Sequence, residues 1–530
     1  MRALLLSAVM AFALTATSGT IVKPAAAQDA ESLLNARCSA CHARLAEGGL
    51  SRISDQRKTP EGWDMTVTRM IVVHGLKIAP EEKHAVVKHL ADTLGLAPSE
   101  SRGWRYALER TPGATDSAPN DDLATMCARC HTFARVALQR RTPEEWVKSG
   151  HFHIGQYPTT EYQFYGRDRP WFDLATGPVA EELAKMLPLD SDEWRNWQQV
   201  AKRDLSGVWR ITGHQPGTGS YQGQLNVQSS GGDRYDVSMS LTYDNGASFS
   251  AEGQALVFTN HEWRASLSTN NERYRQVASV AEDGKTLSGR WFVANNDIVG
   301  GTMNGTRIDA GHQVLSVLPG HLKAGSEATL TIAGVGMTGE AALGDGIQVL
   351  QTLSASPEAV VVKVRAAADA ATGARNVAVG EASGDGLLVV YDKVDTVRVE
   401  PDTTFSRVGG GGGPIPAVPA QFEAIGYMNG DDKEPGTEDD VRIGVLPAAW
   451  SVTDFSEAAA ALKDAHYAGT IDQFGYFTPA VAGPNPERKF GTNNVGDLSV
   501  IAVVDDSGSK VEGRGHLFAT VQRYIDPPIR

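Results

Sequence analysis

All four cysteines of the chain fall within two copies of one short pattern, and this pattern constrains the fold more than any other feature. The copies are Cys38-Ser39-Ala40-Cys41-His42 and Cys127-Ala128-Arg129-Cys130-His131. In c-type haem attachment, two thiols form thioether bonds to one porphyrin, and the histidine that follows them binds its iron. The sequence therefore predicts two covalently bound haem c groups, attached through Cys38, Cys41, Cys127 and Cys130, with His42 and His131 as the proximal iron ligands.

Two other kinds of site also use paired cysteines. A thioredoxin-like redox pair needs a strand that leads into a helix, and it needs no histidine at the next position. A zinc site made from two Cys-x-x-Cys pairs would leave both of the adjacent histidines unexplained. Covalent haem accounts for every residue of the repeated pattern, so it is the interpretation we carry forward.

A longer internal repeat follows each copy of the pattern. Residues 57–63, Arg-Lys-Thr-Pro-Glu-Gly-Trp, recur at 140–146 as Arg-Arg-Thr-Pro-Glu-Glu-Trp. Both segments have the features of a helix start, with threonine at the N-cap, proline in the first turn and glutamate near the positive end of the helix dipole. In the second copy, Thr142 and Glu145 also predict a reciprocal capping box. We therefore expect two related helical lobes, each with one haem.

The repeat also predicts the second axial ligand of each iron. Met70 and His153 stand seven residues after the repeated tryptophans. Methionine and histidine are the two usual distal ligands of a cytochrome haem. The predicted ligand pairs are therefore His42 with Met70 and His131 with His153. Because methionine raises a haem potential relative to histidine, two such haems would differ in potential and form a relay.

The register of a repeat is indirect, so rival ligands stay open. Trp63, Val67, Met70 and His74 would share one face of the predicted helix, which makes His74 an alternative to Met70. Met65 is a second alternative. In the other lobe, His151 competes with His153. A methionine on an apolar helical face is also often only a part of the core.

The N-terminus has the composition of a cleaved export signal. Met1-Arg2 is positively charged, an apolar run covers residues 3–16, and small residues end the segment at Ala27. The apolar run is shorter than the roughly 20 residues that cross a bilayer. We therefore expect residues 1–27 to be removed and the mature chain to work in the periplasm. A net charge of −14 argues against nucleic acid and anionic membrane surfaces as partners.

The remaining chain divides into four parts, which together predict a multidomain α plus all-β fold. Residues 28–203 form the dihaem cytochrome c domain, with the apolar rhythm of helices. Seven or eight short strand-like runs predict an antiparallel β-barrel over 204–310. Residues 311–400 and 401–530 have the pattern of two immunoglobulin-like β domains. A helical segment at Phe455–His466 interrupts the second of them.

Two further segments resemble binding motifs. Gly334–Gly339 matches the dinucleotide fingerprint after a strand, but the residues that follow do not sustain a helix, so we interpret its glycines as turn positions. The acidic loop Asn429–Asp440 carries oxygen ligands suited to calcium, although it lacks the EF-hand spacing. Calcium and a solvated turn are both interpretations of this loop. The hydrolase motifs Gly-x-Ser-x-Gly and His-Glu-x-x-His are absent, and we assign no catalytic acid, base or nucleophile.

Taken together, these features resemble the α subunit of quinohemoprotein amine dehydrogenase. The resemblance rests on the export signal, the two CxxCH patterns, the paired Thr-Pro-Glu segments and the domain order, and it covers essentially the whole mature chain. It implies a dihaem cytochrome, a β-barrel and two immunoglobulin-like domains. It also implies an oxidoreductase acting on primary amines, a heterotrimer with a β-propeller subunit and a small subunit that carries a tryptophylquinone.

The role that the resemblance implies for this chain is electron transfer. Electrons would leave the reduced quinone one at a time, pass through the haems and exit to an azurin-like copper protein or a cytochrome c. The sequence leaves open the amine, the acceptor and the haem that faces the quinone. Three alternatives remain: a dihaem subunit of another periplasmic dehydrogenase, a dihaem peroxidase-like enzyme and a stand-alone electron carrier.

Overall fold

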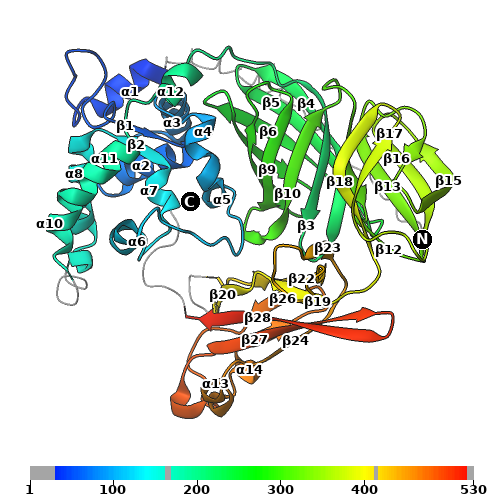
Figure 1. The fold of residues 1–530 in the computed structure, drawn as a ribbon. Coiled ribbons are helices and arrows are strands. Elements are labelled where there is room, and N and C mark those ends of the chain that lie inside the picture. The colour runs from blue at the N-terminus through cyan, green and yellow to red at the C-terminus, as the bar shows by residue number, and fades with distance from the viewer. Residues whose placement is uncertain (1–29, 162–168, 411–415, 522–530) are drawn as a thin grey trace, which may run out of the picture.

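The computed structural model describes residues 30–161, 169–410 and 416–521. The predicted export signal lies outside the described residues. A helical N-terminal domain is followed by a closed β-barrel and by two further β domains (Figure 1), which confirms the predicted α plus all-β class. No helix in the described part of the chain is long and apolar enough to cross a membrane.

The N-terminal domain packs short helices around two separate apolar cores. Its helices are α1 (Ala30–Cys38), α2 (Pro60–Val72), α3 (Pro80–Thr93), α4 (Pro98–Ser101), α5 (Arg105–Leu108), α6 (Asp121–Cys127), α7 (Ala134–Ala137), α8 (Pro143–Gln156), α10 (Trp171–Thr176), α11 (Pro178–Met186) and α12 (Asp192–Trp197). The first core lies around Trp63 and the second around Trp146. The two lobes meet at a small antiparallel sheet of β1 (Gln56–Lys58) and β2 (Gln139–Arg141).

Both repeated segments start helices, as predicted. The hydroxyl of Thr59 accepts from the Gly62 N–H of α2, and that of Thr142 accepts from the Glu145 N–H of α8, each at 3.2 Å. The reciprocal half of the predicted capping box is wrong. The Thr142 N–H donates instead to the Asp55 carbonyl at 3.2 Å. The Glu145 carboxylate is thus free to turn inward, where it accepts hydrogen bonds from groups of the first lobe.

The barrel follows the predicted strand pattern and adds the strand that closes it. Its strands are β3 (Gly207–Gln215), β4 (Gly219–Gly231), β5 (Arg234–Tyr243), β6 (Ser248–Phe258), β7 (Glu262–Ser268), β8 (Arg273–Val280), β9 (Thr286–Val293) and β10 (Asn296–Arg307). β10 pairs with both β9 and β3. A Cβ at Gly300 of β10 would lie 2.2 Å from the Trp291 carbonyl, so the close approach of β10 to β9 requires glycine there.

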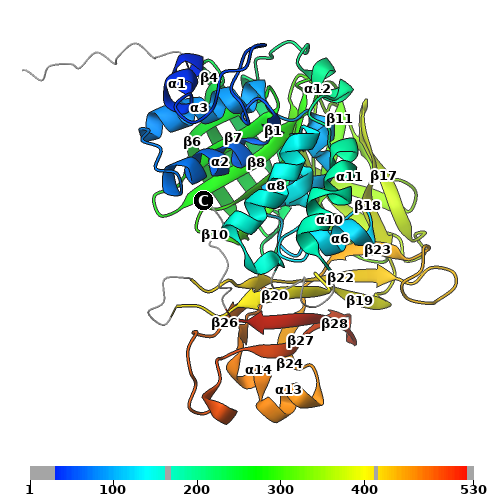
Figure 2. The same cartoon turned by 90° about the vertical axis from the view of Figure 1, so that its left-hand side faces the viewer.

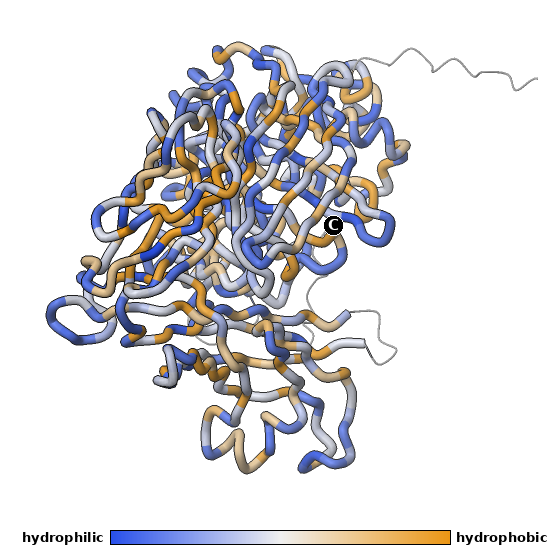
Figure 3. Tube along the Cα trace, turned by 90° about the vertical axis from the view of Figure 1, so that its right-hand side faces the viewer, coloured by the Kyte–Doolittle hydropathy of each residue, from blue (hydrophilic) through white to orange (hydrophobic). Residues whose placement is uncertain are grey.

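The barrel interior is a packed core. Buried and exposed residues alternate strictly along β5, and Figure 3 shows the same alternation of hydrophobic and hydrophilic positions along neighbouring strands. Aromatic side chains fill the centre: Trp209, Tyr221, Trp263 and Trp291. The barrel therefore serves as a rigid support against which other domains dock.

The third domain is one strongly curved sheet. Its strands are β11 (Gln313–Leu318), β12 (His321–Lys323), β13 (Glu327–Val335), β14 (Ala341–Ala342), β15 (Ile347–Ala355), β16 (Ala359–Ala366), β17 (Gly373–Val379) and β18 (Ala382–Tyr391). Gly336 and Gly339, from the segment that matched the dinucleotide fingerprint, have φ values of 59° and 109°. The chain runs from them into β14 and forms no helix, as expected for turn glycines.

The last domain combines small sheets with two short helices. Its elements are β19 (Thr396–Glu400), β20 (Thr403–Arg407), β21 (Ala420–Gln421), β22 (Glu423–Met428), β23 (Val441–Val445), β24 (Ala449–Asp454), α13 (Glu457–Leu462), α14 (Asp464–Tyr467), β25 (Gly469–Ile471), β26 (Tyr476–Pro479), β27 (Gly496–Asp506) and β28 (Ser509–Thr520). The predicted helical segment is divided at Lys463, which has φ 55°. β19 pairs with β22, so this domain begins before the predicted boundary at residue 400.

Ion pairs fix the N-terminal and last domains to the barrel. Glu262 of β7 pairs at 2.8 Å with Arg105 of α5 and at 2.8 Å with Arg264. At the other end, His214 lies 2.6 Å from Glu423 of the last domain. Figures 1 and 2 show the helical domain against one side of the barrel and the last domain beneath both. The barrel thus holds the two cysteine pairs in a fixed place relative to the β domains.

Candidate functional site

The two cysteine pairs occupy equivalent positions at helix ends. α1 ends at Cys38 and α6 ends at Cys127. After the first helix the chain makes one further turn, in which the N–H groups of Cys41 and His42 donate to the Cys38 carbonyl at 3.1 and 3.0 Å. None of the four cysteines takes part in a disulfide, and each pair has one half-buried and one exposed member. The thiols are therefore available for covalent attachment to one group per lobe.

The environment of the thiols differs from that of a redox pair or a zinc site. Burial, and then the neighbouring Cys41, raise the pKa of the Cys38 thiol, while burial and then Glu182 raise the pKa of Cys127 to about 12. Redox-active cysteines instead have lowered pKa values. Among the described residues, no three or more His, Cys, Asp or Glu side chains are grouped to hold a metal ion.

Each proximal histidine is oriented by a backbone carbonyl. His42 Nδ1 lies 2.8 Å from the Ser51 carbonyl oxygen, and His131 Nδ1 lies 3.0 Å from that of Thr132. A carbonyl only accepts hydrogen bonds, so each Nδ1 is protonated, and each neutral ring has its lone pair on Nε2. Metal-binding histidines are commonly held in this way, with the ring nitrogen that does not bind the metal donating to a carbonyl or carboxylate oxygen. Both rings therefore fit the role of a proximal haem ligand.

His153 has the same arrangement on α8. Its Nδ1 lies 2.7 Å from the Ser149 carbonyl oxygen, which leaves Nε2 to act as a ligand. Burial lowers the pKa of His153, the hydrogen bond to the Ser149 carbonyl opposes this, and the charge of His131 lowers the pKa further. The rival His151 is exposed, and its ring lies 5.0 Å from that of Phe172.

In the first lobe, the candidate distal ligands of the iron differ less in their surroundings than in the second lobe. Met70 is half-buried in the last turn of α2, and Met65 is half-buried five residues earlier, on a different face of the helix. His74 does not share the helical face of Met70, because α2 ends at Val72 and Gly75 (φ 72°) follows in a left-handed turn. The prediction that His74 shares a helical face with Trp63, Val67 and Met70 is therefore wrong. Met70 stays our predicted ligand.

The β1–β2 ladder relates the two lobes by a local two-fold axis. Arg57 lies opposite Arg140, its own equivalent in the repeat. Glu100 binds both arginines: its carboxylate receives two hydrogen bonds at 2.8 Å from Arg57 and one at 3.1 Å from Arg140. All three side chains are buried. This Arg–Glu–Arg triad joins the two lobes at their centre.

The next residue in each copy of the repeat is a cation that lies over the repeated tryptophan; Lys58 is buried and Arg141 is partly buried. Lys58 Nζ is 5.2 Å from the Trp63 ring centre, and the Arg141 guanidinium is 5.4 Å from that of Trp146. The indole N–H of Trp63 donates to the Leu94 carbonyl at 2.9 Å. The equivalent N–H of Trp146 is buried and has no hydrogen-bond partner in the described structure.

An orphaned buried donor is uncommon and calls for an acceptor. Trp146 lies in the second core, against which Cys127 also packs, beside the predicted attachment site. The carboxylate side chains of a haem are acceptors of the required kind. The residues of this lobe therefore fit a bound haem in three respects: attachment thiols, iron-facing nitrogen atoms and a free buried donor.

Sequence reasoning missed Glu100 and the role of the paired cations. The signal lay within the repeat, where two consecutive basic residues precede each Thr-Pro, at Arg57-Lys58 and Arg140-Arg141. A basic pair before a helix ordinarily lies in solvent. Its recurrence at equivalent positions was the available sign of a shared structural role.

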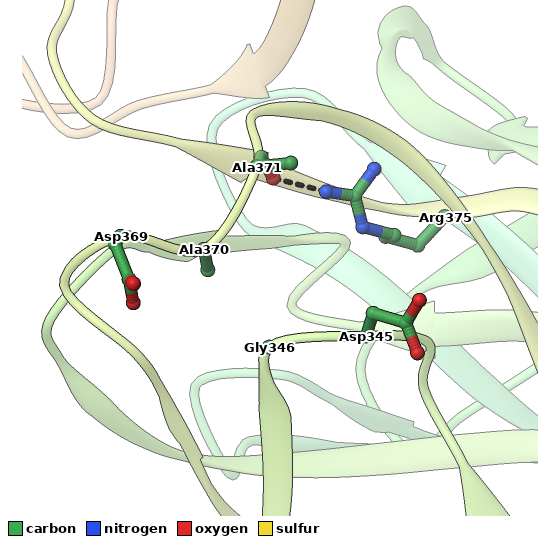
Figure 4. A pocket seen from close by; sticks show the side chains of 6 residues that line it. All are labelled: Asp345, Gly346, Asp369, Ala370, Ala371 and Arg375. Carbon is green, nitrogen blue, oxygen red and sulfur yellow. Dashed lines mark hydrogen bonds between the residues drawn. The ribbon is translucent and has the colours of Figure 1, made fainter.

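A hollow in the third domain and the acidic loop Asn429–Asp440 are two other features of the surface. The hollow, of about 510 Å³, lies in the third domain, where Asp345, Asp369 and Arg375 line it (Figure 4). In the acidic loop predicted to suit calcium, the Asp439 carboxylate accepts hydrogen bonds from the Asp431 N–H and the Thr437 hydroxyl. These internal bonds describe an ordered turn.

Four family models together match nearly all of the chain. Residues 28–194 match "quinohemoprotein amine dehydrogenase A, alpha subunit, haem binding". Residues 202–308, 311–392 and 397–529 match domains II, III and IV of the quinohemoprotein amine dehydrogenase alpha subunit. The matches follow the chain in the order expected of that subunit. The comparison with curated proteins found no match.

Similar solved structures share only parts of the architecture. A redesigned β-barrel bound to DFHBI is 20% identical and covers 19% of this chain and 93% of its own, with a TM-score of 0.17. Mouse clustered PcdhgC3 EC1-3 is 12% identical and covers 47% of this chain and 77% of its own, also with a TM-score of 0.17. Scores this low carry no argument about function.

Proposed function

The chain belongs to the quinohemoprotein amine dehydrogenase α-subunit family, and on this basis we propose that it passes electrons from a quinone on a small partner subunit through two c-type haems to an external acceptor. It is thus the haem-binding subunit of an oxidoreductase acting on amines. The observation that supports the two-haem relay is the duplication: each lobe places a CxxCH pattern at a helix end and a carbonyl-held histidine beside it.

In this proposal the residues of the chain attach, orient and bury the haems. Cys38 and Cys41 attach one, and Cys127 and Cys130 attach the other. The backbone carbonyls that hold the histidine rings keep each Nε2 directed to an iron. A bound haem supplies one-electron chemistry at its iron, and axial ligands and burial set its potential. The buried Arg57–Glu100–Arg140 triad joins the two lobes that carry these sites.

We further propose a periplasmic location and a heterotrimer with a β-propeller subunit and a small tryptophylquinone subunit. The acceptor is an azurin-like copper protein or a cytochrome c. The test is purification of a C-terminally tagged chain from its native host, followed by subunit analysis and acceptor assays. We expect two further chains at equal stoichiometry and oxidation of the reduced complex by one of these acceptors. Recovery of the chain alone, with haems that react only with peroxide, would support the peroxidase-like alternative.

Removing one attachment site should halve the haem content. We expect a Cys127→Ala/Cys130→Ala variant to retain one covalent haem, because the two lobes have separate cores. Pyridine haemochrome absorbance per chain measures this, with Cys38→Ala/Cys41→Ala as the matched variant of the other lobe. A variant with both haems still attached, or an unmodified chain with only one, would contradict the assignment.

The distal ligand of the first lobe is tested by exchange of its type. Met70→His should lower the potential of one haem, because bis-histidine ligation gives lower potentials than histidine–methionine ligation. Met65→His serves as the control, since it introduces the same side chain five residues earlier on α2, on a different face of the helix. Potentiometric titration of the haem bands compares the two. A shift in Met65→His without one in Met70→His would reassign the ligand to Met65.

A further inference from the structure

A crevice between the two lobes has arginine side chains on both of its sides. Its volume is about 150 Å³, and its walls include Arg69, Val72, Val73, Arg135, Phe152 and Tyr157. The guanidinium of Arg69 on α2 lies 4.4 Å from the centre of the Phe152 ring on α8. The two helices that carry the proposed distal ligands therefore face each other here, as Figure 2 also shows.

The crevice lies where the two lobes are related by symmetry. Arg69 and Phe152 each stand six residues after the repeated tryptophan, so they are equivalent positions that contact each other. Contact between equivalent residues places the crevice near the local two-fold axis that also relates β1 to β2. The residue after each is a proposed ligand, Met70 in one lobe and His153 in the other. The crevice is therefore adjacent to both haem sites.

The two arginines at this crevice lack the carboxylate partner that the buried arginines of the domain have. Arg57 and Arg140 share Glu100. In the described part of the chain, no ion pair is formed by Arg69 or Arg135. Arg69 is partly buried and Arg135 is exposed. Two guanidinium groups that face one crevice without a carboxylate between them favour an anionic ligand there.

Lys58 extends the same cationic cluster into the first lobe. It is only 6% exposed, and its ammonium donates to the Thr66 hydroxyl at 2.9 Å, with no carboxylate at ion-pair distance in the described residues. Burial, followed by the charges of Arg141 and Arg69, holds the pKa of Lys58 well below its usual range. Burial and then Arg135 lower the pKa of Arg69. These groups are close enough to repel one another.

We infer that this crevice binds the carboxylate side chains of a haem, with Arg69 and Arg135 as their ionic partners. The inference rests on the proposed dihaem function. Haem c carries two propionate carboxylates, and the planar fork of arginine donors recognises a carboxylate by two parallel hydrogen bonds. Arg69 directly precedes Met70, the proposed ligand of the first-lobe haem. Arg135 follows His131, the proposed ligand of the second-lobe haem, by four residues. The carboxylates therefore belong to one of these two haems.

The cations of the crevice should raise the potential of the haem that they contact. A positive charge near the iron disfavours its ferric state, which carries one more positive charge than the ferrous state. Arg69→Gln and Arg135→Gln should each make the ferrous haem about tenfold less favoured at a given potential, a fall of about 59 mV for a one-electron couple. Arg69→Lys keeps the charge and should recover most of the shift.

The test is a potentiometric titration of the haem-loaded chain in its complex, with Arg195→Gln as the control. Arg195 lies in the same domain and its loss removes the same charge, but its side chain is about half exposed and pairs with Asp190 and Asp192. The inference predicts a fall in the two crevice variants and no change in the control. Equal potentials in all of these proteins would overturn it. A fall in only one of the two potentials identifies the haem concerned.

Folding failure does not block the test. If the Arg69→Gln variant does not assemble, the potential of the Arg135→Gln variant tests the inference. The side chain of Arg135 is exposed and is not part of a core, so this substitution should not affect folding. The haem content and amine response of the unmodified protein are measured separately. Unchanged potentials in variants that hold both haems therefore reject the crevice site and leave the proposed function intact. An unmodified chain without two haems would reject both.

Discussion

Replacing Glu100 with glutamine is expected to destabilise the N-terminal domain by about 3–5 kcal/mol, the range observed when one partner of a buried ion pair is removed. The carboxylate receives hydrogen bonds from Arg57 and Arg140, and the Ser191 hydroxyl lies 2.9 Å from it. A glutamine amide can accept from only one side and presents an N–H group to guanidinium donors. Two buried positive charges would then face each other across the β1–β2 ladder without an anion.

Urea unfolding of the haem-loaded chain, followed by the haem absorbance, measures this effect. The matched control is Glu82→Gln in the same domain, because Glu82 pairs with the partly exposed Arg37 at 2.7 Å. Exposed pairs contribute at most about 1 kcal/mol, so the control should scarcely move the midpoint. Equal midpoints for the two variants would show that the triad does not hold the lobes together.

Replacing Glu262 with glutamine should loosen the N-terminal domain from the barrel. Glu262 is buried between Arg105 of the helical domain and Arg264 of the barrel, each at 2.8 Å. Loss of its charge leaves both guanidinium groups without this anion at the domain junction, a cost of about 3–5 kcal/mol. We expect faster proteolysis near residues 198–206 and a lower melting temperature. Glu327→Gln, at an exposed pair with Lys363 and Arg365, is the control.

The contribution of Glu262 should also depend on pH. Burial opposes its ionisation, but the charges of Arg105 and Arg264 outweigh burial and hold the pKa of Glu262 well below its usual range. A folded-state pKa below the unfolded value gives stability that is present above about pH 4.3 and is lost as pH falls further. The gap in melting temperature between wild type and Glu262→Gln should therefore narrow below pH 4. A gap that widens there would contradict this ion pair.

Local patterns in the sequence predicted the parts of the fold that depend on neighbouring residues. Both CxxCH patterns, both Thr-Pro helix starts and the alternating barrel strands were found where the sequence placed them. Gly75 could have shown that α2 ends before His74, since a glycine in a left-handed turn often follows a helix.

Contacts between distant segments could not be read in this way. Glu100 lies about forty residues from each of its arginine partners, and nothing in its own neighbourhood indicates burial. The crevice depends on how two lobes pack about a local axis, which the repeat suggests but does not determine. β10 was not anticipated in detail because its glycines weaken the strand pattern, while close packing against β9 requires them.

The most direct test of the account is the addition of a primary amine to the purified native complex while the visible haem bands are recorded. If this chain relays electrons from an amine-reduced quinone, both haems should become reduced without any other reductant, and the acceptor should reoxidise them. Haems that remain oxidised in the amine, yet are fully reduced by dithionite, would contradict the account.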